Sequence, residues 1–178
     1  MLRFNSRSAD HPPGRGSREH VAVPADYGPL AGQHFRRVLS NFHVQPFTYT
    51  APEGLGRLSG CRFNSIEHVF QASKIALVDP EAAFRFTLDS GDALGAGDGA
   101  MAQKNRKLVR LAPVQLARWD LVKGGIMARA AACKHAQCPE FRTVLHQTRH
   151  AQLWHIVSRQ PAVRFAHLEA LRGAGYVE

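Results

Sequence analysis

The longest apolar pattern in the chain lies between Pro113 and about His135 and predicts one long helix. One stripe of apolar residues recurs at helical spacing: Trp119, Val122, Ile126, Ala130 and Cys133. The opposite side is also apolar or small: Ala117, Leu121, Gly124, Ala128 and Ala131. A helix that is apolar on both sides is usually central and buried, so we expect the rest of the chain to pack around it.

A second helix is expected from Ser65 to about Val78. The Ser65 hydroxyl is placed to accept a hydrogen bond from the free backbone N–H groups of the first turn. Apolar residues form one face of this helix: Ile66, Val69, Phe70, Ala76 and Leu77. Glu67, Gln71 and Lys74 follow one another at i, i+4 and i+7 and therefore share the adjacent polar stripe.

Shorter elements are expected elsewhere. Strands are predicted as two short segments around a loop in 36–49, then at 61–63 and 153–157. Further helices are predicted at 80–88, 139–149 and 162–171. The stretch 90–99 contains four glycines and is expected to be a loop or a weak helix. Together these patterns predict an α+β fold, a mostly helical single domain with a few short strands.

Residues 1–30 are rich in Arg, Pro, Gly, Ser and His and show no apolar period, so we interpret them as a basic, Pro/Gly-rich N-terminal arm. The domain itself is then expected over 31–178. The net charge is +9 and is uneven, since residues 104–178 carry thirteen Lys/Arg against four Asp/Glu. Either a solvated basic surface or a nucleic-acid or acidic protein partner, bound through the arm and the C-terminal half, explains this excess.

Three cysteines, an odd number, argue against a disulfide framework. They favour the cytoplasm or another reducing intracellular compartment, with a virion or an organelle as alternatives. Cys133, His135 and Cys138 lie close in sequence, but their spacing matches no standard zinc pattern, so no metal site is expected. No run of 18 apolar residues occurs, so we expect no membrane association.

Several of these landmarks, in this order, resemble the NADAR/YbiA-like family of small N-glycosidases over about residues 36–172. The resemblance rests on Leu39-Ser40-Asn41-Phe42, Asn64-Ser65-Ile66-Glu67-His68-Val69-Phe70-Gln71-Ala72-Ser73-Lys74, Lys104-Asn105-Arg106, Arg118-Trp119-Asp120 with Lys123 and Met127, and Leu145-x-x-Thr148. It implies a helix-rich α+β domain that hydrolyses a ribose C–N bond in a phosphorylated ribosylamino or ADP-ribosyl substrate, including ADP-ribosylated guanine. It implies no metal and no organic cofactor.

The resemblance also implies roles for particular residues. Glu67 would be the catalytic carboxylate, because breaking a ribose C–N bond builds positive charge on the sugar and needs an activated water. The expected substrate-binding residues are Asn41, Phe42, His68, Gln71, Lys74, Arg106 and Trp119. Trp119 would stack on a base or ribose, or else belong to the core. The helix dipole, Lys74 and His68 are expected to tune the pKa of Glu67.

Near the C-terminus the chain departs from the family pattern. Relatives carry a second acidic residue there, whereas this chain has neither an acid nor a glycine between Ala151 and Leu168. Asp120, Lys123 and His155 are weaker candidates to complete the site. Three hypotheses follow: an active N-glycosidase, a reader that binds ADP-ribose without cleaving it, or a catalytically degenerate component of an assembly such as a virion or ribonucleoprotein.

Overall fold

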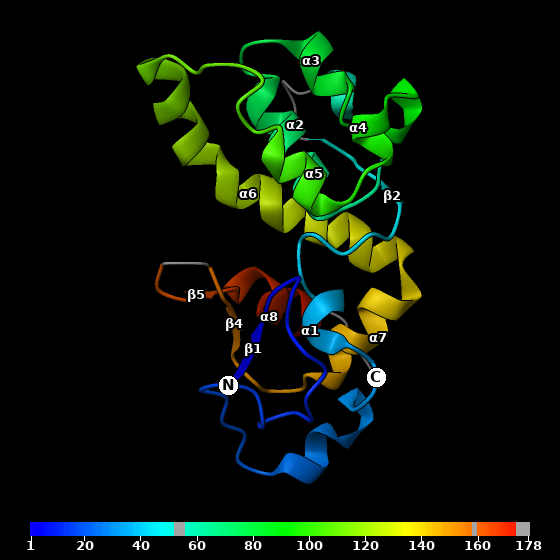
Figure 1. The fold of residues 1–178 in the computed structure, drawn as a ribbon, viewed down its shortest axis with the longest axis vertical. Helices are drawn as coiled ribbons and strands as arrows, with labels where there is room; N and C mark the ends of the chain where they lie inside the picture. Colours follow the sequence, from blue (N-terminus) through cyan, green and yellow to red (C-terminus); the bar gives the residue numbers. More distant parts are fainter. Residues whose placement is uncertain (52–55, 158–159, 174–178) are drawn as a thin grey trace. The chain divides into compact units, whose positions relative to one another are not determined.

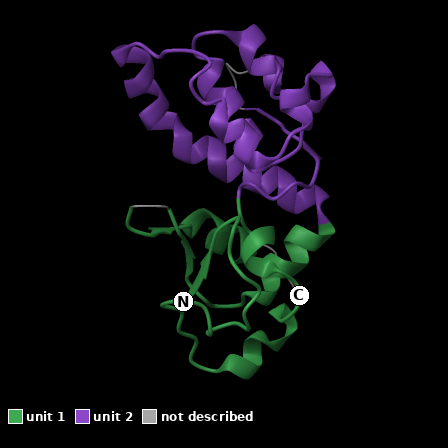
Figure 2. Cartoon of the chain, in the orientation of Figure 1, with its two compact units in different colours: residues 1–40, 139–178 green, residues 41–138 purple. Residues whose placement is uncertain are grey.

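The structure is a computed structural model of the chain, and it describes residues 1–51, 56–157 and 160–173. Figure 1 shows a helix-rich chain with a few short strands, which confirms the predicted α+β class. The chain divides into two compact units, shown in Figure 2: residues 1–40 with 139–178 form unit 1, and residues 41–138 form unit 2. Among the described residues, no helix has both the length and the apolar character needed to cross a membrane.

Unit 1 is built on a three-stranded sheet of order β1-β4-β5. Strand β1 (Leu2–Phe4) runs parallel to β4 (Leu153–His155), with Leu2 opposite Leu153, and β5 (Val163–Arg164) pairs antiparallel with β4. The remaining elements of the unit are η1 (Pro24–Leu30), α1 (Phe35–Val38), α7 (Pro139–Gln147) and α8 (Ala166–Gly173). Fully buried side chains from both ends of the chain make its core: Leu2, Phe4, Leu30, Phe35, Phe141, Leu145 and Leu153.

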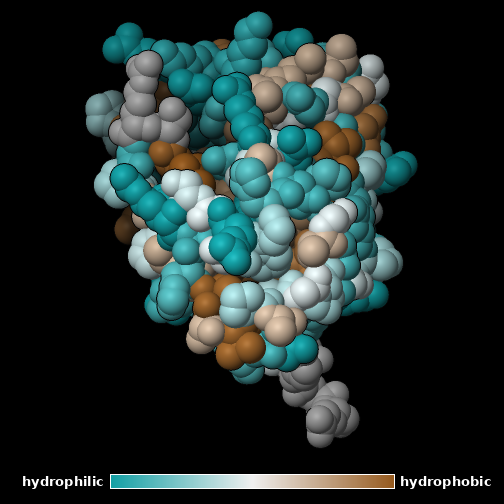
Figure 3. Space-filling view, turned by 60° about the horizontal axis from the view of Figure 1, so that its bottom comes forward, coloured by the Kyte–Doolittle hydropathy of each residue, from teal (hydrophilic) through white to brown (hydrophobic). Residues whose placement is uncertain are grey.

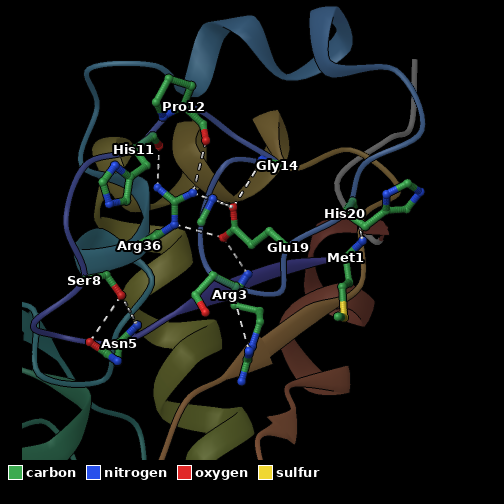
Figure 4. Close-up of polar contacts among 12 residues, drawn as sticks. Met1, Arg3, Asn5, Ser8, His11, Pro12, Gly14, Glu19, His20 and Arg36 are labelled. Carbon is green, nitrogen blue, oxygen red and sulfur yellow. Dashed lines mark hydrogen bonds and ion pairs between the residues drawn. The ribbon is translucent and has the colours of Figure 1, made fainter.

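The segment expected as an N-terminal arm lies within unit 1, where a buried ion pair holds it (Figure 4). Arg36, on α1, donates from Nε to Oε1 of Glu19 over 2.9 Å, and both side chains are almost wholly buried. The Glu19 carboxylate also accepts from the backbone N–H groups of Arg3, Gly14 and Gly16. These bonds close residues 3–19 around one carboxylate, so residues of this chain order the segment.

Unit 2 is organised around α2 (Ile66–Ile75), which packs against α6 (Pro113–Gln137), α3 (Pro80–Phe84) and α5 (Gly99–Lys104). A two-stranded antiparallel sheet, β2 (Phe47–Thr48) with β3 (Arg62–Phe63), joins α6 and α2 in this core. The shorter elements are η2 (Gly56–Leu58), η3 (Leu88–Ser90) and α4 (Ala93–Ala96). Helix α2 confirms the expected Ser65 cap, since the Ser65 hydroxyl accepts from the backbone N–H of His68.

One expectation about local structure was wrong, and an alternative left open by another is resolved. The first predicted strand, around Val38 and Leu39, is the short helix α1, because Phe35, Val38 and Leu39 bury one helical face rather than alternate sides. The glycine-rich stretch 90–99 contains α4 and the start of α5. Asp92 and Asp98 cap these two helices by accepting from backbone N–H groups of their first turns, which offsets the low helix propensity of glycine.

The long helix has the expected extent but not the expected burial. Helix α6 packs against α2, and Trp119, Ile126 and Ala130 of its expected apolar stripe are buried. On its other side Leu121 is 86% exposed and Val114 is 75% exposed. The prediction that α6 is buried on both sides is therefore wrong over its first half, because apolar spacing alone does not say whether a second layer covers a helix.

Candidate functional site

Glu67 occupies the first turn of α2 and is 6% exposed. Two backbone features fix its position. Ser65 caps the helix two residues earlier, and the Glu67 backbone N–H donates to the carbonyl oxygen of Asn41 over 2.9 Å. The loop that carries Asn41 is thereby tied to the first turn of the helix that carries Glu67.

The carboxylate of Glu67 has one direct side-chain partner among the described residues. Gln71, one turn along α2, donates from Nε2 to Oε1 of Glu67 over 2.7 Å. An ionised carboxylate only accepts hydrogen bonds, so the Gln71 amide must present its NH₂ group to Glu67. Its oxygen then points away, and in the described part of the chain that buried Oε1 has no hydrogen-bond partner. The pair therefore offers an unused acceptor beside a carboxylate.

Burial raises the pKa of Glu67 above its usual value of 4.5 because it disfavours the charged form. The hydrogen bond from Gln71 and the charge of Arg106 act in the opposite direction but do not cancel the burial. The helix dipole at this position also favours the anion. The sequence pointed to Lys74 and His68 as the tuning groups, whereas among the described residues Arg106, just after α5, is the cation that lowers the pKa of Glu67.

Asn41 and Phe42 form the loop beside this helix. Asn41 is 5% exposed, and its Nδ2 lies 3.5 Å from the sulfur of Met127 on α6. Phe42 is half-buried and rests directly on Gly99, where an added Cβ would lie 2.4 Å from the Phe42 Cα. Gly99 thus permits the close approach of the loop to α5. Nothing in the single sequence indicated this contact, since a glycine that makes room for another segment looks like any loop glycine.

Trp119 packs inside unit 2. It is 4% exposed and meets Phe70 of α2 edge to face, with ring centroids 4.8 Å apart. This contact corresponds to the core alternative left open by the sequence, and stacking of Trp119 on a substrate stays a prediction. Phe70, expected only as part of an apolar face, thus contacts the Trp119 ring directly.

His68 is fully buried, and both of its ring nitrogens are engaged. Its Nε2 donates to the carbonyl oxygen of Leu94 over 3.1 Å, and its Nδ1 lies 2.8 Å from the Ser65 hydroxyl, which donates to it. Burial lowers the pKa of His68, which keeps the ring neutral and suits this pair of bonds. In this arrangement His68 ties α2 to α4, and neither ring nitrogen is left for the substrate contact that we expected.

Within residues 1–51, 56–157 and 160–173, the other expected site residues make no hydrogen bond or ion pair with Glu67. Lys74 is half-buried on α2, and Lys123 forms an exposed ion pair with Asp120 on α6 over 2.6 Å. His155 belongs to β4 of unit 1. In the part of the chain that the structure describes, no three His, Cys, Asp or Glu side chains group as a metal site.

Glu169 directly follows the stretch from Ala151 to Leu168, which contains no acidic residue, and its contacts give it a structural role. Glu169, on α8, accepts from the Leu153 backbone N–H over 2.9 Å and pairs with Arg164 over 2.7 Å. The Arg164 bond and the Leu153 bond lower the pKa of Glu169 despite partial burial. The carboxylate therefore joins α8 to strands β4 and β5. Residues 158–159 of this region lie outside the described residues.

The family model of the NADAR domain matches residues 31–160, and the chain belongs to this family. The matched range contains Asn41, Glu67, Gln71, Arg106 and Trp119, so the whole candidate site lies inside the domain. No curated protein and no solved structure matched the chain.

Proposed function

We propose that the protein is an N-glycosidase that hydrolyses the ribose C–N bond of a phosphorylated ribosylamino or ADP-ribosyl substrate, including ADP-ribosylated guanine, with Glu67 as the central carboxylate. Family membership supports the reaction class. The assignment of Glu67 rests on its burial next to the Gln71 Oε1, a hydrogen-bond acceptor without a partner in the described residues. Burying a carboxylate costs free energy, and buried carboxylates with a shifted pKa are concentrated at functional sites.

The chemistry requires a base for the attacking water and a negative charge near the anomeric carbon. As the C–N bond breaks, positive charge develops on the ribose. A carboxylate stabilises that charge and accepts the proton of the water. The raised pKa of Glu67 makes it a stronger base than an exposed glutamate. Burial thus serves the proposed role while it costs stability.

The neighbours of Glu67 suit the remaining tasks. The Gln71 Oε1 can accept from the attacking water or from a ribose hydroxyl, which would satisfy the acceptor now without a partner. Arg106 is exposed and acts electrostatically on Glu67, so a phosphate bound by Arg106 would sit close to the reacting sugar. Asn41 would line the same site from the loop.

The test compares Glu67→Gln with the wild-type protein for release of free base from phosphoribosylamino-pyrimidine and ADP-ribosyl-guanosine substrates. Loss of the acid–base group should lower the rate about 10²–10⁴-fold. Glu81→Gln is a matched control in the same unit, because the Glu81 side chain is 74% exposed on α3. Equal rates for wild type and Glu67→Gln, or no release by the wild type from any of these substrates, would contradict the proposal.

The degenerate-assembly hypothesis has lost one of its supports. The basic N-terminal segment was expected to bind a partner as an arm, but the bonds between Glu19 and Arg36 of the same chain hold part of it within unit 1. What still favours this alternative is the missing second acid, since Glu169 is bonded to Arg164 and Leu153. Tight binding of ADP-ribose without base release would instead favour the reader.

A further inference from the structure

On the face drawn in Figure 3, hydrophobic residues form small separate patches among hydrophilic ones, as on most solvated surfaces. Buried polar side chains carry more information, because their burial costs free energy unless each polar group finds a partner. Asn64 of unit 2 is such a residue: it is 7% exposed and lies between strand β3 and Ser65, the cap of α2. The groups that its amide bonds therefore indicate what it does.

The side chain of Asn64 holds the end of helix α4. Its Nδ2 donates to the carbonyl oxygen of Ala96 over 3.1 Å and to that of Gly97 over 2.7 Å. The last carbonyl groups of a helix have no partner within the helix, and a primary amide has two N–H groups to offer them. The Asn64 amide thus matches, in number and in kind, the two acceptors at the point where the chain leaves α4.

A third bond holds the same helix from α2. The Nε2 of His68 donates to the carbonyl oxygen of Leu94 over 3.1 Å. Asn64 and His68 together therefore bond the carbonyl groups of residues 94, 96 and 97. One bond alone would let this short helix pivot, whereas bonds spread over its last turn also fix the direction in which the chain continues.

Helix α5 begins directly after this fixed point. Asp98 follows Gly97 and caps α5, since its side chain accepts from the backbone N–H of Met101 over 2.8 Å. Arg106 lies just after the end of α5, and its Nη1 donates to the carbonyl oxygen of Gln103 on that helix over 3.3 Å. The place of the Arg106 guanidinium therefore depends on where α5 is held.

The backbone of Asn64 bonds a second segment beside the candidate site. Its carbonyl oxygen accepts from the N–H of Gln45 over 3.0 Å, in the loop that also carries Phe42. Phe42 in turn lies directly on Gly99 of α5. A single residue three positions before Glu67 thus bonds both the loop and the turn between α4 and α5, which approach each other at Gly99.

We propose that Asn64 is a positioning residue, which fixes the start of α5 and thereby places Arg106 to bind a substrate phosphate near Glu67. This role rests on the proposed function, in which Arg106 binds the phosphate while Glu67 acts on the sugar. The packing of α5 against α2 and the electrostatic effect of Arg106 on Glu67 support it. Asn64 acts through Arg106 and needs no contact of its own with the substrate.

The experiment measures the affinity for ribose 5-phosphate by isothermal titration calorimetry in a double-mutant cycle. Asn64→Leu removes both amide donors without adding charge and should weaken binding about tenfold, the contribution of one charge-assisted hydrogen bond. Arg106→Gln should weaken binding to a similar extent. The double variant should bind no more weakly than Arg106→Gln alone, because both changes remove the same contact.

Thr87→Val is the matched control. Thr87 is fully buried in the same unit, and its hydroxyl donates to the Phe84 carbonyl oxygen over 2.8 Å, away from α5. Its loss lowers stability without moving Arg106, so this variant should bind ribose 5-phosphate like the wild type. Asn64→Ser, which is smaller and too short to reach both carbonyl groups, takes the place of Asn64→Leu in the cycle if the latter does not fold.

Additive losses in the double variant would overturn the proposal, since Asn64 would then act independently of Arg106. Binding by the Asn64 variant as tight as that of Thr87→Val would overturn it too, as would no binding of ribose 5-phosphate by the wild type. If the cycle gives the expected result but the wild type releases no base, the proposed catalysis fails while the positioning role of Asn64 is supported.

Discussion

Acid should destabilise unit 1 through two histidines. His155 and His167 both lie against Phe165, with ring centroids 4.9 and 4.7 Å away, and His155 also contacts Phe4. In the described residues the buried Nε2 of His167 has no hydrogen-bond partner. Burial among these rings lowers the pKa of each histidine from 6.5 to about 4, because the charged form loses its hydration.

The difference between folded and unfolded pKa fixes the direction and size of the effect. Between pH 6.5 and 4 the unfolded chain binds a proton at each of these positions and the folded chain does not, so stability falls as the pH falls. Each histidine should therefore cost the folded state up to about 2 kcal/mol at pH 5 relative to pH 7, and ~3 kcal/mol at pH 4.

Urea unfolding at pH 7 and pH 5 measures this loss. The chain has two tryptophans, Trp154 in unit 1 and Trp119 in unit 2, so a Trp119→Phe background lets fluorescence report unit 1 alone. In that background His155→Gln and His167→Gln should each remove about 2 kcal/mol of the loss at pH 5, whereas exposed His20→Gln should not. The reasoning is refuted if both variants lose as much stability between pH 7 and pH 5 as their parent.

Three further predictions concern Glu67, Gly99 and the Glu19–Arg36 pair. Burial raises the pKa of Glu67, so the folded state loses stability as the pH rises through that pKa. The melting temperature of Glu67→Gln should therefore exceed that of the wild type at pH 7 and equal it at pH 4. A lower melting temperature of the variant at pH 7 would contradict this. Gly99→Ala forces Phe42 away from α5 and should lower the rate of base release at least tenfold, with a smaller relative effect on the free energy of unfolding. An unchanged rate of base release would show that the loop tolerates the shift. Glu19→Gln leaves Arg36 buried without its counter-charge, so it should lower the free energy of unfolding by about 3–5 kcal/mol and expose the first 20 residues to trypsin. If the variant resists trypsin as well as the wild type does, the ion pair does not hold this segment.

The sequence predicted elements well where one physical signal dominates. Helix α2 was predicted from its serine cap and its apolar face, and both are present. The extent of helix α6 was predicted from the helical spacing of its apolar residues. Helix α1 was missed because four residues carry too little pattern to distinguish a helical face from alternation. For α4 the sequence left a loop or a weak helix open, and α5 was missed, because the glycines of this stretch outweighed the aspartates that cap both helices.

The candidate site divides in the same way. Glu67 and Gln71 lie one turn apart on one helix, so their contact follows from spacing alone. The contact of Asn41 with the first turn of α2 joins positions 26 residues apart and follows only from folding. The environments of His68 and Arg106 also depend on segments distant in sequence. His68 is buried and bonds to Leu94 on α4, and Arg106 acts on Glu67 of α2.

By itself, the sequence determined the helical framework, the family and the position of Glu67 on its helix, because local hydrogen bonding and side-chain periodicity depend on near neighbours. Only the tertiary structure decided that Glu67 is buried with an unused acceptor beside it, that α6 leaves Leu121 exposed, and that the N-terminal segment closes on Arg36. Burial and electrostatic environment depend on what packs against a residue, and in this chain the packing segments come from distant parts of the sequence.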